Sequence, residues 1–240
     1  MRINYTYYNN YELLAKVIEH YEPIKDVFAF TVIDDGSSRE PLTRDMLPDW
    51  IRGLRVTEDH GWGNEVCRNI LMRETDHQWN ALLDLDYVIE DLPSVSLLYD
   101  GFKDFKFCFQ FESGRSVDYN DFRTEVDDGR MINSFIVSKN AWHQTYGYDM
   151  TFGYLYGYDH TFFEQLDAEV ILPGSRLRKI ASQGAPEEWR PAPGDQTAFD
   201  SVKQQSKEYA ATGFYKPGTG WTNESERLAR CIPFPEYVAF

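Results

Sequence analysis

The chain has 240 residues, of which 39 are acidic and 24 basic, so its formal net charge at pH 7 is −15. A chain of this length can bury one sizeable core, or one domain with an appendage. The acidic balance argues against binding to nucleic acid or to an anionic membrane surface, because both need basic patches on the protein.

We expect neither a signal peptide nor a transmembrane segment. The N-terminus has no basic stretch followed by an apolar core. No window approaches about 18 uninterrupted apolar residues, the length that a spanning helix needs. Cys67, Cys108 and Cys231 are odd in number and widely spaced, which favours unbridged thiols in a reduced, cytoplasmic protein.

The N-terminal part of the chain has a strand–helix–strand pattern. Residues 3–8 and 28–33 are apolar, β-branched and aromatic runs that predict strands. Asn10 is the expected N-cap of a helix between them. The apolar residues at helical spacing are Leu13, Leu14, Val17, Ile18 and Tyr21. Strand, helix and strand over so short a span predict two parallel strands joined by a crossover helix.

Polar residues follow each expected strand. Asn9 comes after the first strand, Asp35 after the second, and Asp84 and Asp86 after the apolar run at 81–83. In open α/β sheets, ligands bind outside the carboxyl ends of the strands, so we expect these side chains to line one crevice. A tight polar turn is the other interpretation of residues 34–38.

The Asp84-Leu85-Asp86 run suggests a metal site. Residues i and i+2 of a strand point to the same side, so both carboxylates can face one object. Buried like charges repel unless a positive group lies between them. Hard oxygen ligands suit Mg²⁺ and Mn²⁺, although an isolated run of this kind is usually a solvated loop end.

The second half of the chain is less regular. Strands are predicted within residues 106–111, 134–137 and 170–173, the last at a sheet edge, and helices at 139–146 and 199–211. The stretch from 146 to 158 holds five Tyr and three Gly. Because glycine permits sharp turns and functional residues favour loops, this stretch favours a binding loop over a packed structural one.

Taken in chain order, these motifs resemble those of the family 2 glycosyltransferases, which have the GT-A fold. The segments that carry the resemblance are 8–10 with 32–38, 62–69, 84–86, 147–150 and 156–163. In the family they correspond to the opening of the domain, an Arg-Asn pair that opens a helix, the Asp-x-Asp metal motif, and the Gly-Gly-x-Asp-Glu and acidic acceptor-side motifs. The resemblance runs to about Phe163.

The resemblance implies an α/β GT-A fold, a single Rossmann-like domain with a mainly parallel mixed sheet flanked by helices. We expect the catalytic domain at residues 1–180. Within it, 1–100 would bind the nucleotide sugar and 101–180 the acceptor. Residues 181–240 would form a C-terminal extension packed on the catalytic domain.

The resemblance also implies an activity. A hexosyltransferase would move a sugar from a nucleoside-diphosphate sugar, a UDP-sugar above all, to a glycan or other hydroxyl acceptor, with inversion and with Mn²⁺ or Mg²⁺ as cofactor. Asp86 and Asp84 would bind the metal. The expected nucleotide-sugar residues are Tyr8, Asn9, Asp35, Asn64, Arg68, Asp84 and Leu85. The expected acceptor residues are Tyr148, Asp149, Tyr156 and Tyr158.

The resemblance assigns the catalytic base to Asp159, at the start of a short expected helix. The sequence departs from the commonest family pattern, because His160 stands where a second acid is usual. Either Asp159 alone is the base, or His160 takes part as base, orienting residue or additional metal ligand. The structural alternative for Asp159 is N-capping of the helix.

Three other functions are compatible with parts of the sequence. A sugar nucleotidyltransferase would need a Gly-rich phosphate loop near the N-terminus, where this chain has Tyr-Tyr-Asn-Asn. A non-catalytic nucleotide-sugar or carbohydrate-binding protein would need neither metal acids nor a base. A purely structural protein would show no stabilisation by nucleotide.

Overall fold

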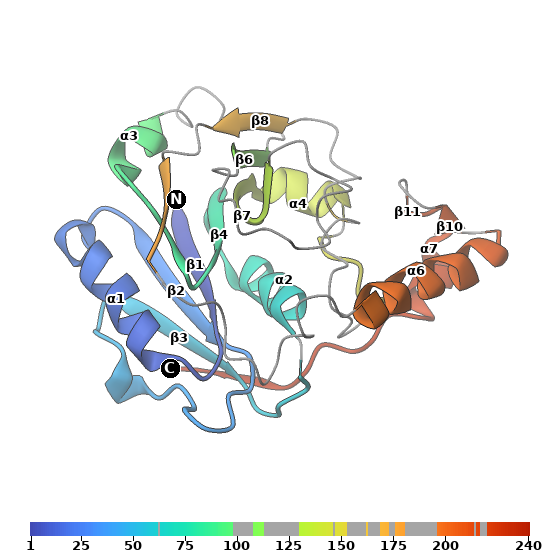
Figure 1. Cartoon of the computed structure of the whole chain (residues 1–240), viewed down its shortest axis with the longest axis horizontal. Coiled ribbons are helices and arrows are strands. Elements are labelled where there is room, and N and C mark those ends of the chain that lie inside the picture. The colour runs from blue at the N-terminus through green and yellow to red at the C-terminus, as the bar shows by residue number, and fades with distance from the viewer. Residues whose placement is uncertain are drawn as a thin grey trace.

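An eight-stranded sheet forms the centre of the structure, a computed structural model. The structure describes residues 1–61, 63–97, 108–112, 130–145, 147–152, 162, 169–172, 176–180, 196–213, 215–216 and 220–240. Helices α1 (Tyr11–Tyr21) and α2 (Asn64–Glu74) flank the sheet (Figure 1).

The sheet is mixed and mainly parallel. In spatial order its strands are β12 (Tyr237–Ala239), β3 (Ile51–Val56), β2 (Ala29–Asp34), β1 (Arg2–Tyr7), β4 (Trp79–Asp84), β7 (Arg130–Ser138), β6 (Cys108–Glu112) and β8 (Glu169–Leu172). Strands β3, β2, β1 and β4 pair in parallel, as do β6 and β8. Strands β12 and β7 run the opposite way. The predicted α/β class with a mainly parallel mixed sheet is therefore confirmed.

The predicted strand–helix–strand unit is also confirmed, as β1, α1 and β2. Asn10 caps α1, since its Oδ1 accepts the Leu13 N–H at 3.1 Å. The buried helix residues are Leu13, Leu14, Val17 and Tyr21, all of which the periodicity had identified.

The two faces of the sheet carry separate apolar clusters. In β4, Ala81 and Leu83 belong to the cluster that contains the α1 residues, whereas Leu82 belongs to the cluster that contains the α2 residues. This alternation is what the two-residue period of a strand requires. The sheet is therefore buried on both faces, as expected for parallel strands.

Some elements agree with the sequence and others were not foreseen. The expected helices appear as α4 (Lys139–Thr145) and α6 (Gln196–Ala211), and β8 is an edge strand as predicted. The sequence patterns did not indicate β3, or the antiparallel pair of β5 (Tyr87–Ile89) and β9 (Leu177–Lys179). The other short elements are η1 (Glu22–Ile24), η2 (Arg44–Met46), α3 (Leu92–Leu97), β10 (Tyr215–Lys216), β11 (Gly220–Trp221) and α7 (Glu224–Leu228).

The C-terminal part of the chain contacts the rest of the structure at several places, among them β3 and the segment at 147–152. Strand β12 pairs with β3, and the Tyr209 hydroxyl donates to Thr151 O at 2.6 Å. Figure 1 shows α6, α7, β10 and β11 to one side of the sheet. Within the described ranges, none of the helices combines the length and apolar content that spanning a bilayer requires.

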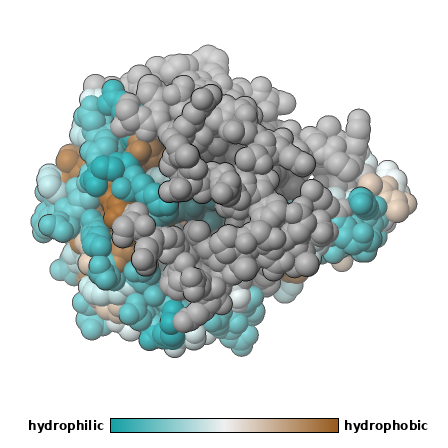
Figure 2. Space-filling model, in the orientation of Figure 1, coloured by the Kyte–Doolittle hydropathy of each residue, from teal (hydrophilic) through white to brown (hydrophobic). Residues whose placement is uncertain are grey.

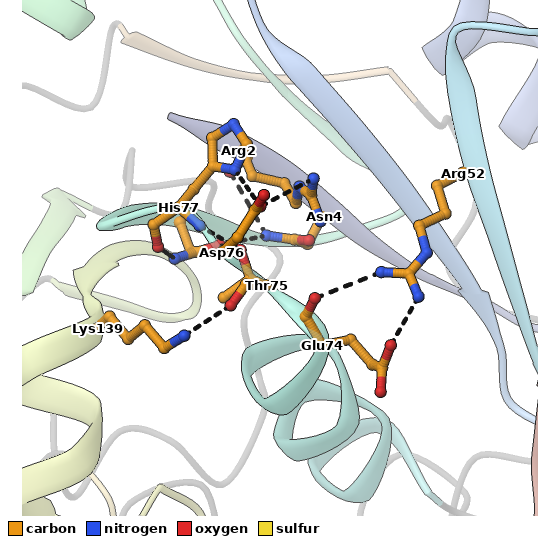
Figure 3. Close-up of polar contacts among 9 residues, drawn as sticks. Arg2, Asn4, Arg52, Glu74, Thr75, Asp76, His77 and Lys139 are labelled. Carbon is orange, nitrogen blue, oxygen red and sulfur yellow. Dashed lines mark hydrogen bonds and ion pairs between the residues drawn. The ribbon is translucent and has the colours of Figure 1, made fainter.

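Basic side chains surround the C-terminal end of α2 (Figure 3). Arg52 donates to Glu74 O at 3.3 Å and to Glu74 Oε2 at 2.6 Å, and Lys139 donates to Thr75 O at 2.7 Å. Cations at this end satisfy the last carbonyl groups and oppose the negative end of the helix dipole. These contacts tie β3 and α4 to the turn between α2 and β4.

The described surface is mainly polar. On the face seen in Figure 2, small hydrophobic patches lie between hydrophilic residues. The large hydrophobic side chains exposed among the described residues are Val27, Leu228, Phe234 and Val238. Single exposed apolar side chains are ordinary on a protein surface.

The edge between β3 and β12 generates a first prediction. Gly53 and Phe240 exchange backbone hydrogen bonds of 2.9 and 3.0 Å, and a Cβ on Gly53 would lie 2.3 Å from a ring carbon of Phe240. We expect Gly53→Ala to lower the free energy of unfolding by roughly 1–3 kcal/mol, because the ring must move. Urea denaturation of Gly53→Ala, Phe240→Ala and the double variant measures this, and the cost of Gly53→Ala should shrink in the Phe240→Ala background. An equal cost in both backgrounds would refute the steric explanation.

Candidate functional site

The carboxyl ends of β1, β2 and β4 lie next to one another at one edge of the sheet, here called the carboxyl edge. The strand register places Tyr7 beside Asp34 and Thr6 beside Asp84. The Asp35 N–H donates to Tyr7 O at 2.9 Å. The predicted meeting of these strand ends is thus confirmed, and it occurs where open α/β sheets bind ligands.

Asn9 holds the loop that follows β2. Its Oδ1 accepts the N–H groups of Arg39 and Glu40 at 2.9 and 3.0 Å, and its own N–H donates to Ser37 Oγ at 2.9 Å. Its φ of 45° lies in the left-handed region, which asparagine tolerates better than most residues. Asn9 therefore shapes the carboxyl edge.

Tyr8 links the carboxyl edge to the loop after β3. Its hydroxyl donates to Asp59 Oδ2 at 2.8 Å. In the same region Gly36 has a φ of 72°, and a Cβ there would lie 2.3 Å from Glu58 O. Only glycine fits this close approach, so the loops after β2 and β3 pack directly against each other.

Asp34 is a structural residue. It is fully buried, and its two oxygens accept the N–H groups of Ser37 and Leu42, both at 2.8 Å. A carboxylate that bonds backbone N–H groups a few residues further along is typical turn chemistry. The turn interpretation of this segment therefore holds for Asp34.

Asp35 lies against the start of α2. Its Oδ2 accepts the Gly63 N–H at 3.0 Å, and the Cys67 thiol lies 3.4 Å from its Oδ1. A Cβ on Gly63 would be 2.3 Å from Asp35 Oδ1, so the contact requires glycine there. Burial raises the pKa of Asp35 to about 8, although the bonds from Cys67 and Gly63 oppose the shift. The carboxyl group is therefore mainly protonated at neutral pH.

Arg68 is buried at the centre of the site, with 1% of its surface exposed. It donates to Asp84 Oδ1 at 2.8 Å and to the Tyr148 hydroxyl at 3.0 Å, and it also donates to Asn133 O. Its guanidinium lies 5.7 Å from the centre of the Phe135 ring. Burial by itself would lower the pKa of Arg68, but Tyr148 and Asp84 outweigh it and raise the pKa. Arg68 is therefore a permanent buried cation.

Asp84 is fixed by contacts on several sides. Besides Arg68, Asn64 Nδ2 lies 3.4 Å from its Oδ1, and its N–H donates to Ser134 Oγ at 3.2 Å. The next residue, Leu85, packs against the apolar cluster on the α1 face. Its predicted role in nucleotide-sugar binding stays a prediction.

Asp86 has a cationic neighbour that the sequence did not reveal. Lys179 Nζ lies 3.6 Å from Asp86 Oδ2, and the Ile180 N–H donates to Asp86 O at 2.8 Å. Lys179 comes from β9, where it pairs with Tyr87 of β5. The two strands are far apart in the sequence, so no local pattern could have placed Lys179 here.

Asp84 and Asp86 offer the carboxylate oxygens that Mn²⁺ and Mg²⁺ prefer. Among the residues that the structure describes, no three His, Cys, Asp or Glu side chains converge to enclose a metal ion. Mg²⁺ is commonly held by one or two carboxylates, with water and substrate phosphates completing its shell. The two aspartates fit a cation shared with a diphosphate; Asp84 also bonds Arg68, and Asp86 also pairs with Lys179.

Tyr148 and Asp149 lie in the protein interior. Asn69 accepts the Tyr148 N–H at 3.0 Å and donates to Tyr148 O at 2.9 Å. The Tyr148 side chain is fully buried with its hydroxyl on Arg68, and Asp149 Oδ1 accepts the Thr151 N–H at 3.0 Å. Tyr148 therefore positions Arg68, and Asp149 shapes the following turn. The acceptor contacts of both residues stay predictions.

Four predicted site residues lie outside the described residues: Tyr156, Tyr158, Asp159 and His160. Their roles therefore stay predictions.

Two residues inside the 62–69 motif, Gly63 and Cys67, contact Asp35 but were not assigned a role. The signal that could have identified Gly63 was its place directly before the expected helix, next to Asn64.

The raised pKa of Asp35 predicts a pH-dependent stability. A protonated Asp35 favours the folded state, so its stabilising contribution is present below the unfolded pKa of about 4 and is lost as pH rises through about 8. Relative to Asp35→Asn, the wild-type free energy of unfolding should fall by roughly 1 kcal/mol per pH unit between these values. Urea denaturation of both proteins at several pH values measures the difference. Parallel pH profiles would show that Asp35 titrates normally.

Neither the family models nor the curated proteins include a match to this chain. Solved structures do match. The structure of S. aureus TarS 1-349 in complex with UDP-GlcNAc superposes with a TM-score of 0.60 at 12% identity, over 86% of this chain and 65% of that chain. A second match is glucosyl-3-phosphoglycerate synthase from Mycobacterium tuberculosis in complex with Mn²⁺, UDP and phosphoglyceric acid. It superposes with a TM-score of 0.57 at 13% identity, over 85% of this chain and 77% of that chain.

These likenesses concern the fold, because the identities are low. The chain spans 39% to 65% of the length of the TarS chains that it matches. The mainly parallel mixed sheet and the helices that flank it agree with the expectation from the sequence. The chain has the GT-A fold of nucleotide-sugar glycosyltransferases.

Proposed function

We propose that this chain is a metal-dependent glycosyltransferase that moves a sugar from a UDP-sugar to an acceptor hydroxyl with inversion. The observation that carries the proposal is the carboxyl edge, where β1, β2 and β4 end side by side on a GT-A fold and Arg68 pairs with Asp84. Asp35, Asp84 and Asp86 stand at or just after these strand ends. Support also comes from two proteins of this fold, TarS and the mycobacterial synthase, whose structures contain UDP-GlcNAc and UDP with Mn²⁺.

In this proposal the nucleoside lies over the loops after β1 and β2. Asp35 is mainly protonated near pH 7, so its carboxyl group can both donate and accept a hydrogen bond. A nucleobase edge offers both kinds of partner. Tyr8, half-buried beside Asp59, presents a flat ring close to the same loops. Asn9 acts indirectly, by holding the loop in place.

The diphosphate end lies at Asp84 and Asp86. These two residues would hold Mn²⁺ or Mg²⁺, which when bound neutralises the negative charge of the leaving diphosphate. Arg68 fixes one oxygen of Asp84, so the carboxylate cannot turn away from the site. Lys179 balances the charge of Asp86 when no other cation is near.

Transfer itself requires a base on the acceptor side. The acceptor oxygen attacks the anomeric carbon from the face opposite the diphosphate, the bond from that carbon to the diphosphate breaks, and the configuration inverts. The hydroxyl proton passes to the base, for which Asp159 is our first candidate and His160 the second. General bases of this kind contribute roughly 10²- to 10⁴-fold to the rate.

Nucleotide binding should depend on metal. UDP is expected to raise the melting temperature only when Mn²⁺ or Mg²⁺ is present, because a cation that bridges protein and phosphates links the two binding events. Asp86→Ala should abolish this shift. Asp26→Ala, which removes an exposed acid away from the site, is the matched control and should keep it.

Equal stabilisation by UDP in excess EDTA, or in Asp86→Ala, would contradict the metal site. GDP and deoxythymidine diphosphate in the same thermal-shift experiment test the choice of nucleotide. Hydrolysis of UDP-sugar with Mn²⁺, absent with EDTA, separates an enzyme from a binding protein. Metal-dependent UDP binding without hydrolysis or transfer would leave only the binding function.

Replacement of the base should stop transfer without unfolding the protein. We expect Asp159→Asn to keep UDP binding and the melting temperature, because asparagine caps a helix almost as well as aspartate. The transfer rate of Asp159→Asn should fall by roughly 10²- to 10⁴-fold, whereas His160→Ala should lose much less of the transfer rate. Steady-state transfer assays on both variants measure this. The reverse ranking would assign the base to His160, and two active variants would remove both from the mechanism.

A further inference from the structure

The opposite end of the parallel strands carries a polar hollow, here called the amino-edge pocket. It has a volume of about 390 Å³ and lies where β1, β2 and β3 begin. Its charged lining includes Arg2, Arg44 and Arg52, and its apolar lining includes Phe30, Trp50 and Phe240. Strands of six residues separate it from the carboxyl edge by roughly 20 Å.

The pocket is locally basic in an acidic protein. Asp49 is the one acidic residue that lines it, against three arginines, while the whole chain has a net charge of −15. The Arg44–Asp49 and Arg2–Asp76 distances are 2.7 and 3.2 Å, but the Asp49 side chain is fully exposed and that of Asp76 is 80% exposed. Ion pairs with exposed carboxylates contribute little, so they leave the guanidinium groups available to another anion.

Arg2 has unused hydrogen-bonding capacity inside the protein. Its side chain is 14% exposed, and its buried Nε has no hydrogen-bond partner. Burial lowers the pKa of Arg2, Asp76 opposes the shift and the nearby Arg52 adds to it. A buried donor without a partner destabilises the protein, and two neighbouring guanidinium groups repel. An oxyanion would relieve both.

The other two guanidinium groups are already held in position. Arg44 donates to Pro48 O and Ile51 O at 3.4 and 3.1 Å. Figure 3 shows Arg2 and Arg52 reaching the turn after α2, where Arg52 bonds Glu74. Arginine has five N–H groups, so each side chain keeps donors beyond those used here. Donors fixed before binding lose little entropy when a ligand arrives.

Beside the arginines, the pocket has an aromatic wall. The Phe30 and Trp50 rings meet edge to face with centroids 4.9 Å apart, and Phe30 is buried. Trp50 is half-buried and lines the pocket together with Phe240. A flat apolar surface next to guanidinium groups suits a ligand that has an anionic end and a compact organic body.

We propose that the amino-edge pocket binds a small phosphate ester, with the phosphate among Arg2, Arg44 and Arg52 and the organic part against Trp50 and Phe240. Phosphate matches guanidinium groups because several of its oxygens can accept hydrogen bonds from different directions. The pocket volume limits the ligand to about the size of a phosphorylated monosaccharide. The site is separate from the carboxyl edge and does not depend on the proposed transferase function.

Isothermal titration of the full chain with glucose 6-phosphate tests this proposal, with glucose and inorganic phosphate as separate titrants at matched ionic strength. Glucose 6-phosphate should bind to the wild type. Arg2→Gln and Arg44→Gln should each lower the affinity for it about tenfold or more, the factor for losing one charge-assisted hydrogen bond. Arg176→Gln also removes an arginine paired with an exposed aspartate, but Arg176 does not line the pocket, so this variant should bind glucose 6-phosphate normally. Trp50→Ala should lower the affinity for glucose 6-phosphate more than the affinity for inorganic phosphate.

Several results would overturn the proposal. Absence of binding to the wild type would do so, as would equal affinity for inorganic phosphate and the ester, which would leave the aromatic wall without a role. If Arg2→Gln and Arg44→Gln both keep the wild-type affinity and their melting curves show that they fold, the ligand binds at another site. Saturation with UDP and Mn²⁺ should leave glucose 6-phosphate binding intact. Loss of binding under that condition would assign the ester to the carboxyl edge instead.

Discussion

The buried guanidinium of Arg68 is the contact on which the site depends. It joins the end of β4 through Asp84, strand β7 through Asn133 O, and the segment at 147–152 through Tyr148. Removing one partner of a buried ion pair leaves an uncompensated charge, which is strongly destabilising. Because Asp84 is both a partner of Arg68 and the first acid of the Asp-x-Asp run, the interaction that holds these segments together also sets where that carboxylate lies.

Two pairs of acids lie at the carboxyl edge. Asp34 is satisfied by backbone N–H groups and Asp84 by Arg68, so both are used by the fold. Asp35 lies against the start of α2 with its pKa raised to about 8 by burial, and Asp86 pairs with Lys179 at 3.6 Å. Each pair therefore has one acid that the fold itself uses. At the amino edge, three arginines and Asp49 line the pocket.

The sequence predicted what local patterns and strand ends determine. The helix capped by Asn10, the parallel β1–β2 pair and the meeting of the carboxyl ends follow from periodicity and from the general architecture of α/β sheets. Strand β3 was missed because arginines and a glycine interrupt its apolar pattern. The places of Lys179 and Tyr148 depend on contacts between distant segments, so their spacing alone suggested neither the ion pair with Asp86 nor burial against Arg68.

The central claim is that a nucleotide with its metal binds at the carboxyl edge of this fold. Paramagnetic broadening of backbone amide resonances by Mn²⁺ with UDP, compared with diamagnetic Mg²⁺ and UDP, locates the metal directly in solution. The account expects the strongest broadening at Gly63, Asp84 and Asp86 and the weakest at Arg2 and Arg52. Broadening centred on Arg2 and Arg52, or spread evenly over the chain, would contradict it.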